Sequence, residues 1–157
     1  MRLALMLLPL AACGGGSTGG GVDAADDCSA DPRQDTFVVG LDKHGTVGNL
    51  DFVLMTAQPA PPARGDNTWV LEVNAMSQGV VGSPMTGVDM AVTPFMPDHQ
   101  HGTPIPVKVV AMPTAGQYQL SPINMWMPGY WETTIQAQAG AGGTTTDTVV
   151  FKFCVPN

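Results

Sequence analysis

Apolar and polar residues alternate along much of the chain after residue 28. The clearest example is residues 131–139, where two sets of positions alternate, Thr133, Ile135 and Ala137 on one side and Glu132, Thr134 and Gln136 on the other. A period of two is that of a half-buried β-strand, because successive side chains point to opposite faces. No segment shows an apolar period of 3.6 residues, so we expect strands and no helices.

Eight segments are predicted to be strands, and the residues between them are rich in glycine and proline. These segments are 36–41, 50–55, 69–76, 88–93, 107–112, 117–124, 131–139 and 148–155. Seven or eight short strands with such turns are typical of an all-β, immunoglobulin-like antiparallel β-sandwich. We therefore predict a single domain over residues 28–157, a length that suits one core. Residues 140–146 are expected to form a hairpin tip.

The N-terminal segment has the pattern of a bacterial export signal. Arg2 precedes the apolar run 3–12, which is too short to span a bilayer as a mature helix. Leu10-Ala11-Ala12-Cys13 resembles a lipobox, which implies that residues 1–12 form a lipoprotein signal peptide and that Cys13 carries the lipid. Residues 13–27 are rich in Gly, Ser, Thr, Ala and Asp, which predicts a flexible tether. An ordinary secretory signal with a coincidental cysteine is the alternative.

Charge narrows the choice of partners. The chain has 6 Lys and Arg against 13 Asp and Glu, a formal charge of −7, and removal of Arg2 would make it more negative still. This acidic balance argues against nucleic-acid binding, which needs clustered basic residues. No basic membrane-binding patch is evident, so membrane attachment would depend on Cys13. We expect a periplasm-facing protein of the cell envelope, and Gly14 after the lipidated cysteine favours the outer membrane by analogy with lipoprotein sorting.

Two cysteines are left once Cys13 is assigned to the lipid. In an exported chain, Cys28 and Cys154 are predicted to form a disulfide. Such a bridge would close nearly the whole domain into one loop, for which the chain-entropy treatment gives on the order of 4–5 kcal/mol. The alternative is that one of these thiolates is a metal ligand, which an oxidising compartment disfavours.

One segment combines histidines with a constrained turn. His99 and His101 lie two residues apart between Pro97 and Gly102, close to Met96. In an extended segment two such side chains point the same way with Cα atoms about 6.5 Å apart, a gap that a metal ion can bridge. The proline and the glycine restrict the backbone, which lowers the ordering cost at binding.

A second segment supplies thioethers. Met125 and Met127 also lie two residues apart, so in an extended segment they would share one face, with Trp126 on the other. Thioether is a soft ligand suited to Cu(I), and imidazole binds either oxidation state of copper. Two imidazoles with one or two thioethers suit copper better than zinc.

Structural interpretations compete with each of these assignments. Met125 and Met127 could fill gaps in the core, and the two histidines could be solvated loop residues. Asp98 could orient an imidazole or be an exposed turn residue, and a zinc site formed by Asp98, His99 and His101 is a third interpretation. His44 lies in a turn-like Lys43-His44-Gly45 and is interpreted as a surface residue. The three tryptophans are expected to pack in the core.

The order of these motifs resembles a known family. The segments Asn67–Trp69, Met96–Gly102, Gly116–Tyr118 and Met127–Trp131 together resemble the YtkA-like domain family, which is similar to the FixH-like proteins associated with copper oxidase assembly. The resemblance covers roughly residues 37–155. It implies an exported β-sandwich with a role in copper handling. Applied to the matching positions of this sequence, the resemblance implies that Met96, His99, His101 and Met127 are metal ligands. It supports Met125 less, because the matching family position is often apolar.

These observations predict a membrane-anchored, periplasmic copper-binding protein that holds copper or delivers it to a protein partner. The alternative is an interaction module of the cell envelope that binds no metal. Enzymatic activity is not expected, because the sequence shows no nucleophile elbow, no phosphate-binding glycine loop and no cysteine–histidine pair with a free thiol. The copper hypothesis requires the histidine turn and the Met-Pro-Gly turn to meet at one end of the sandwich.

Overall fold

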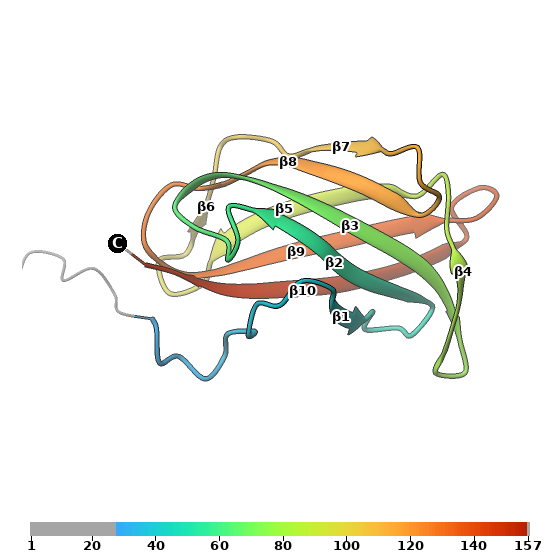
Figure 1. Cartoon of the computed structure of the whole chain (residues 1–157), viewed down its shortest axis with the longest axis horizontal. Helices are drawn as coiled ribbons and strands as arrows, with labels where there is room; N and C mark the ends of the chain where they lie inside the picture. Colours follow the sequence, from blue (N-terminus) through green and yellow to red (C-terminus); the bar gives the residue numbers. More distant parts are fainter. Residues whose placement is uncertain (1–27, 157) are drawn as a thin grey trace, which may run out of the picture.

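The computed structural model describes residues 28–156, and within them the chain forms ten strands and no helix (Figure 1). The strands are β1 (Leu41–His44), β2 (Leu50–Gln58), β3 (Gly65–Ser77), β4 (Val80–Pro84), β5 (Asp89–Met96), β6 (His101–Gly102), β7 (Lys108–Ala111), β8 (Gln117–Met125), β9 (Gly129–Ala139) and β10 (Thr145–Val155). No helix in this part of the chain could therefore cross a membrane.

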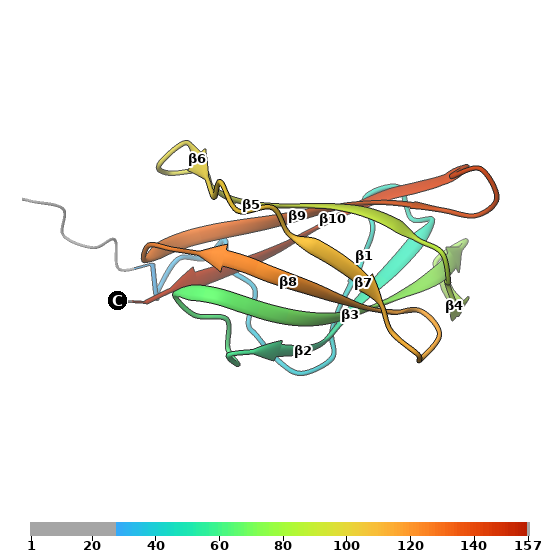
Figure 2. The same ribbon diagram turned by 90° about the horizontal axis from the view of Figure 1, so that it is seen from above.

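The strands form two antiparallel sheets that pack as a sandwich (Figure 2). The first sheet has the order β1-β2-β3-β8-β7, with β4 paired to β3, and the second has the order β10-β9-β5-β6. If β2 is strand A of an immunoglobulin domain, β2-β3-β8-β7 is A-B-E-D and β10-β9-β5-β6 is G-F-C-C′. The predicted all-β, immunoglobulin-like antiparallel sandwich is confirmed, with ten strands in place of seven or eight.

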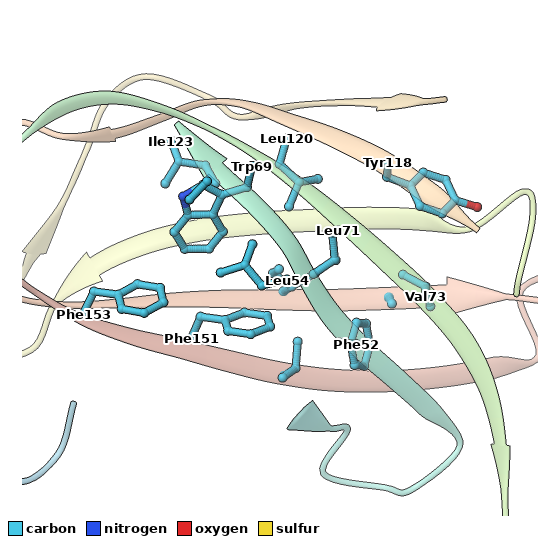
Figure 3. Packing of buried hydrophobic residues seen from close by; sticks show 14 of the residues in the cluster. Phe52, Leu54, Trp69, Leu71, Val73, Tyr118, Leu120, Ile123, Phe151 and Phe153 are labelled. Atoms are coloured by element: carbon cyan, nitrogen blue, oxygen red, sulfur yellow. The ribbon is translucent and has the colours of Figure 1, made fainter. Parts of the chain in front are cut away.

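The core lies between the two sheets and follows the alternation seen in the sequence. Along β9 the positions from Trp131 to Ala139 alternate between buried and less buried side chains, and β10 behaves likewise. Trp69 is completely buried, and its ring meets the edges of Phe151 and Phe153 at centroid distances of 6.0 and 5.6 Å (Figure 3). Large aromatic side chains thus join the first sheet to the last strand of the second.

Three short strands depart from the prediction. The segment 36–41 was expected to be a strand, but the first strand begins at Leu41, and Val38 and Val39 before it are 52% and 70% exposed. All five residues of β4 are exposed, so no alternation marks it, and its extended conformation depends on pairing with β3. β6 has two residues, too few to carry a pattern.

The predicted disulfide is confirmed. Cys28 and Cys154 are bonded, with Cα atoms 5.4 Å apart, and they are separated by 126 positions in sequence. The bridge ties the first described residue to β10. The backbone N–H of Asp35 also donates to the Lys152 carbonyl at 2.8 Å, so the segment after Cys28 is attached to the same strand. The predicted signal peptide (1–12), lipidated Cys13 and tether (13–27) lie outside the described residues.

Candidate metal centre

The histidine turn and the Met-Pro-Gly turn meet at one end of the sandwich (Figure 1). The imidazole of His101 stacks on the indole of Trp126, with ring centroids 5.3 Å apart and planes 27° from parallel. The Trp126 Nε1–H donates to the Gly102 carbonyl at 3.5 Å. A Cβ atom on Gly129 would lie 2.5 Å from Cε of Met96, so the Met96 side chain occupies the space beside that glycine. The arrangement that the copper hypothesis requires is therefore present.

Met96 and His101 face the same side of the second sheet. They are direct partners in the antiparallel register of β5 and β6, and directly opposite residues project from one face. Met96 is completely buried and His101 is half-buried. The close approach of β6 to β5 depends on Gly102, because a Cβ there would lie 2.8 Å from the Pro94 carbonyl oxygen. The strand pairing thus brings one thioether and one imidazole together.

His99 lies beside His101, although not through the extended geometry expected from sequence. Residues 97–100 form a turn in which Gln100 has a left-handed φ of 55°, and the Gln100 side-chain amide donates to the Pro97 carbonyl. The two imidazole centroids are still only 5.8 Å apart, with planes at 60°. His99 is exposed and His101 is not, so one imidazole faces solvent and the other the end of the core.

The surroundings of His101 favour one tautomer. Its Nδ1 lies 3.2 Å from the Gly102 carbonyl oxygen. With the proton on Nδ1, that nitrogen donates to the carbonyl and leaves the Nε2 lone pair for a metal ion. The Trp131 ring, at 6.4 Å and 74° from His101, adds a second aromatic wall. His101 is therefore oriented by two indoles and a backbone carbonyl.

The methionines differ in burial. Met96 and Met125 are fully buried members of the core, whereas Met127 is partly buried and packs against it. β8 ends at Met125 and residues 127–128 bend, so the strand alternation that was expected to put Met125 and Met127 on one face stops between them. The Met127 carbonyl accepts a hydrogen bond from Trp131 Nε1 at 3.0 Å, which fixes the bend.

The position of Trp126 differs from the sequence-based expectation. It was expected to pack in the core, but it is 46% exposed because it follows the end of β8 and stacks over His101. Trp69 and Trp131 are fully buried, as expected. The indole of Trp126 therefore belongs to the site rather than to the core, and the sequence signal for it was its position between Met125 and Met127.

Asp98 is held by an arginine that sequence reasoning did not single out. Arg33 donates to both carboxylate oxygens of Asp98 at 2.8 and 2.6 Å, donates to Asp31, and lies 4.1 Å from the centroid of the Tyr130 ring. The hydrogen bonds from Arg33 lower the pKa of Asp98 below its usual value. Asp98 thus fits the turn-residue interpretation and ties the histidine turn to the N-terminal segment beside Cys28.

Comparison with known proteins gives a family and no named relative. A YtkA-like family model matches residues 45–136, which is more than half of the chain and includes both turns of the candidate metal centre. No curated protein matches the chain, and no solved structure does. The chain therefore belongs to the YtkA-like family.

Proposed function

We propose that this protein binds copper in the cell envelope, and that it holds the ion or delivers it to a protein partner. The ligands are the imidazoles of His99 and His101 and the thioethers of Met96 and Met127. The observation that carries the proposal is the register pair of Met96 and His101 beside the Met127 turn, which groups nitrogen and sulfur donors at one end of the fold.

The chemistry of the donor set fits copper. Thioethers suit Cu(I) and need no deprotonation, and a neutral imidazole binds either oxidation state. Met96 is completely buried and is the register partner of His101, so its thioether would have to move to bind an ion beside that imidazole. An unbranched, flexible side chain makes such a movement easier. Met125 is equally buried and is the weakest of the candidate ligands.

The contrast between the two histidines suggests how the ion exchanges. His101 is enclosed by Trp126 and Trp131, whereas His99 is exposed in the turn. An incoming partner would therefore first compete with His99 for the ion. We propose binding and transfer, and not catalysis, as the role of this centre.

Cu(I) titration with tryptophan fluorescence tests this function. Trp126 stacks on His101, so an ion bound by His101 should quench its emission. We expect the parent to bind one Cu(I), His101→Ala to lose most of the affinity, and His99→Ala to lose less. Met112→Ala is the matched control, because it removes a thioether from the loop that follows β7 and leaves both turns of the candidate centre unchanged. Equal affinities for the parent and both turn variants would refute the proposal.

Envelope attachment is a separate part of the proposal and depends on Cys13. We expect the protein expressed from its full gene to fractionate with membranes, favouring the outer membrane, and Cys13→Ser to release it into the soluble fraction. Mass spectrometry of the N-terminal peptide would identify the lipid. Unmodified Cys13 in membrane-free parent protein would contradict this part without bearing on copper.

A metal-free interaction module is the second candidate function. The observation that favours it is the exposure of Trp126, at 46%, with Ile105 at 40% on the segment that follows β6. Exposed aromatic side chains of this kind often mark protein contacts. If the parent binds no copper, and if Trp126→Ala abolishes recovery of an envelope partner by cross-linking, this function replaces the first.

A further inference from the structure

A second group of metal-ligating side chains lies on β1 and β2, in the other sheet. Asp42 and His44 are two residues apart on β1, and Asp51 on β2 is directly opposite His44 in the antiparallel register. Residues two apart on a strand, and residues directly opposite on its partner, project from the same face. The three side chains therefore converge, and one ligand atom from each lies within 4.8 Å of the other two.

The burial of Asp51 is the feature that indicates a ligand. Its side chain is 1% exposed, although Asp42 and His44 beside it are exposed. Asp51 Oδ2 accepts a hydrogen bond from Asn74 Nδ2 at 3.2 Å. No donor within residues 28–156 makes a hydrogen bond to Asp51 Oδ1, which lies 3.7 Å from His44 Nε2 and faces the cluster. A buried carboxylate oxygen without a hydrogen bond is costly, and a cation between the three side chains would offset that cost.

The charges of the cluster also favour a cation. Asp42 and Asp51 bring two carboxylates together with one imidazole, and like charges this close repel each other strongly where one of them is buried. A divalent cation would neutralise both carboxylates. A protonated His44 would neutralise only one of them and would place a proton where a metal could bind.

We propose that Asp42, His44 and Asp51 form a site for a borderline divalent cation of the zinc class. Zinc binds imidazole nitrogen and carboxylate oxygen at about 2.0–2.2 Å with tetrahedral geometry, which corresponds to ligand atoms about 3.4 Å apart. Small rotations of the exposed Asp42 and His44 side chains would close the present spacing to that value. Three protein ligands leave the fourth position for water or for a group from another molecule.

The donor set distinguishes this site from the first one. It has no thioether, so it gives no preference for Cu(I). It also has too few oxygen ligands for tight binding of Ca²⁺, which takes six to eight. The two sites therefore select ions of different softness, and the zinc site does not depend on the proposed copper function.

The backbone of this site is fixed in advance by the second sheet. Asp147 on β10 accepts hydrogen bonds from the backbone N–H groups of Val47 and Asn49, in the loop between β1 and β2, and of Leu50, the first residue of β2. His44 and Asp51 flank this loop, so their separation is held before any ion arrives. Less order has to be gained at binding, which favours affinity.

Calorimetric titration with Zn²⁺ alone tests the proposal. The background is the full chain carrying His99→Ala and His101→Ala, which removes both imidazoles of the candidate copper centre. We expect one Zn²⁺ to bind with a rise in Tm, and Asp51→Asn and His44→Gln each to weaken binding by at least about tenfold. Asp89→Asn, an exposed carboxylate on β5, is the matched control and should bind as the background does.

Two results would overturn the site. One is the absence of saturable Zn²⁺ binding in the background protein, which would mean that the two carboxylates share a proton instead of an ion. The other is an unchanged affinity in His44→Gln, whose exposed side chain can be replaced without disturbing the core. The His44→Gln result stays decisive if the buried Asp51→Asn substitution prevents folding, and neither result bears on Cu(I) binding by the histidine turn.

Discussion

Asp147 shows how one buried carboxylate organises backbone from the opposite sheet. It is 3% exposed and accepts hydrogen bonds from Val47, Asn49 and Leu50 at 2.8–3.0 Å. Its carboxylate sits against Gly45, where an added methyl group would overlap it. Sequence alone did not reveal this role, because Asp147 looks like an ordinary polar residue at the start of an alternating strand, and its partners are about 100 positions away.

The lowered pKa of Asp147 should contribute to the pH dependence of stability. Burial alone would raise the pKa of Asp147, but the backbone N–H donors outweigh burial and lower it below its usual value. A lowered folded pKa gives stability that is fully present above the unfolded pKa of about 3.9 and is lost as pH falls through the folded pKa. In urea unfolding from about pH 5 to about pH 2, Asp147→Asn should therefore lose less stability than the parent. Parallel losses would contradict this role.

At neutral pH, Asp147 should contribute to stability through its hydrogen bonds. Asp147→Ala removes the acceptor of four backbone N–H groups, those of Val47, Asn49, Leu50 and Thr148, and we expect it to lower the free energy of unfolding by about 3 kcal/mol in urea unfolding.

Gly129 tests the contact between the two turns. It has a φ of 129°, and a Cβ there would lie 2.5 Å from Cε of Met96. Gly129→Ala should displace Met96 and weaken Cu(I) binding by about tenfold. Gly142→Ala is the matched control, because Gly142 also has a positive φ, 74°, but a Cβ there would meet no heavy atom within 4 Å. Unchanged Cu(I) affinity in Gly129→Ala would mean that the Met96 thioether is not a ligand.

At the scale of elements, alternation predicted the strands that bury a full face and missed those that do not. Residues 131–139 and 148–155 lie within β9 and β10, because each alternates against the core. β4 and β6 were missed, since an exposed hairpin strand and a two-residue strand carry no apolar period. β6 is nevertheless the element that places His101 opposite Met96, so the least predictable strand builds the candidate site.

The role proposed for His44 also depends on a short strand that the sequence pattern did not reveal. The sequence suggested a surface residue in a turn, and its side chain is indeed 53% exposed. It is, however, the last residue of β1 and pairs with Asp51 in register. A pattern of single residues could not reveal this pairing, because it depends on which strand lies beside β1.

The turn of residues 97–100 should depend on the N-terminal segment for its order. Arg33 makes a bidentate contact with Asp98, and both groups are substantially exposed, so the pair should contribute little to global stability. We expect Arg33→Gln to leave Tm nearly unchanged and to speed amide hydrogen exchange in residues 97–102. Lys108→Gln, which removes the same charge from β7, should leave exchange there as in the parent. Unchanged protection in Arg33→Gln would show that the turn orders itself.

The bond between Cys28 and Cys154 closes the described domain. The sequence predicted it, because these two cysteines remain once Cys13 is assigned to the lipid in a chain expected to be exported. The bridge encloses nearly all described residues. Replacing both cysteines with serine should lower the free energy of unfolding by about 4 kcal/mol, mainly through the added entropy of the unfolded chain. Urea unfolding measures this, and a loss below about 1 kcal/mol would contradict it.

The fold builds its two candidate ion sites from different strands. The proposed copper ligands lie where the β5–β6 and β8–β9 turns meet, and the Asp42, His44 and Asp51 group lies on β1 and β2. The family match and the sandwich could be anticipated from motif order and alternation. The second ion site could not, since its ligands belong to no motif and come together only through strand register.

X-ray absorption spectroscopy of the Cu(I)-loaded protein tests the central claim most directly, because it reports the atoms bound to the ion. The account predicts a mixed shell of imidazole nitrogen and thioether sulfur, with the nitrogen contribution reduced in His101→Ala. A shell of nitrogen and oxygen without sulfur, in protein loaded with one Cu(I), would contradict it.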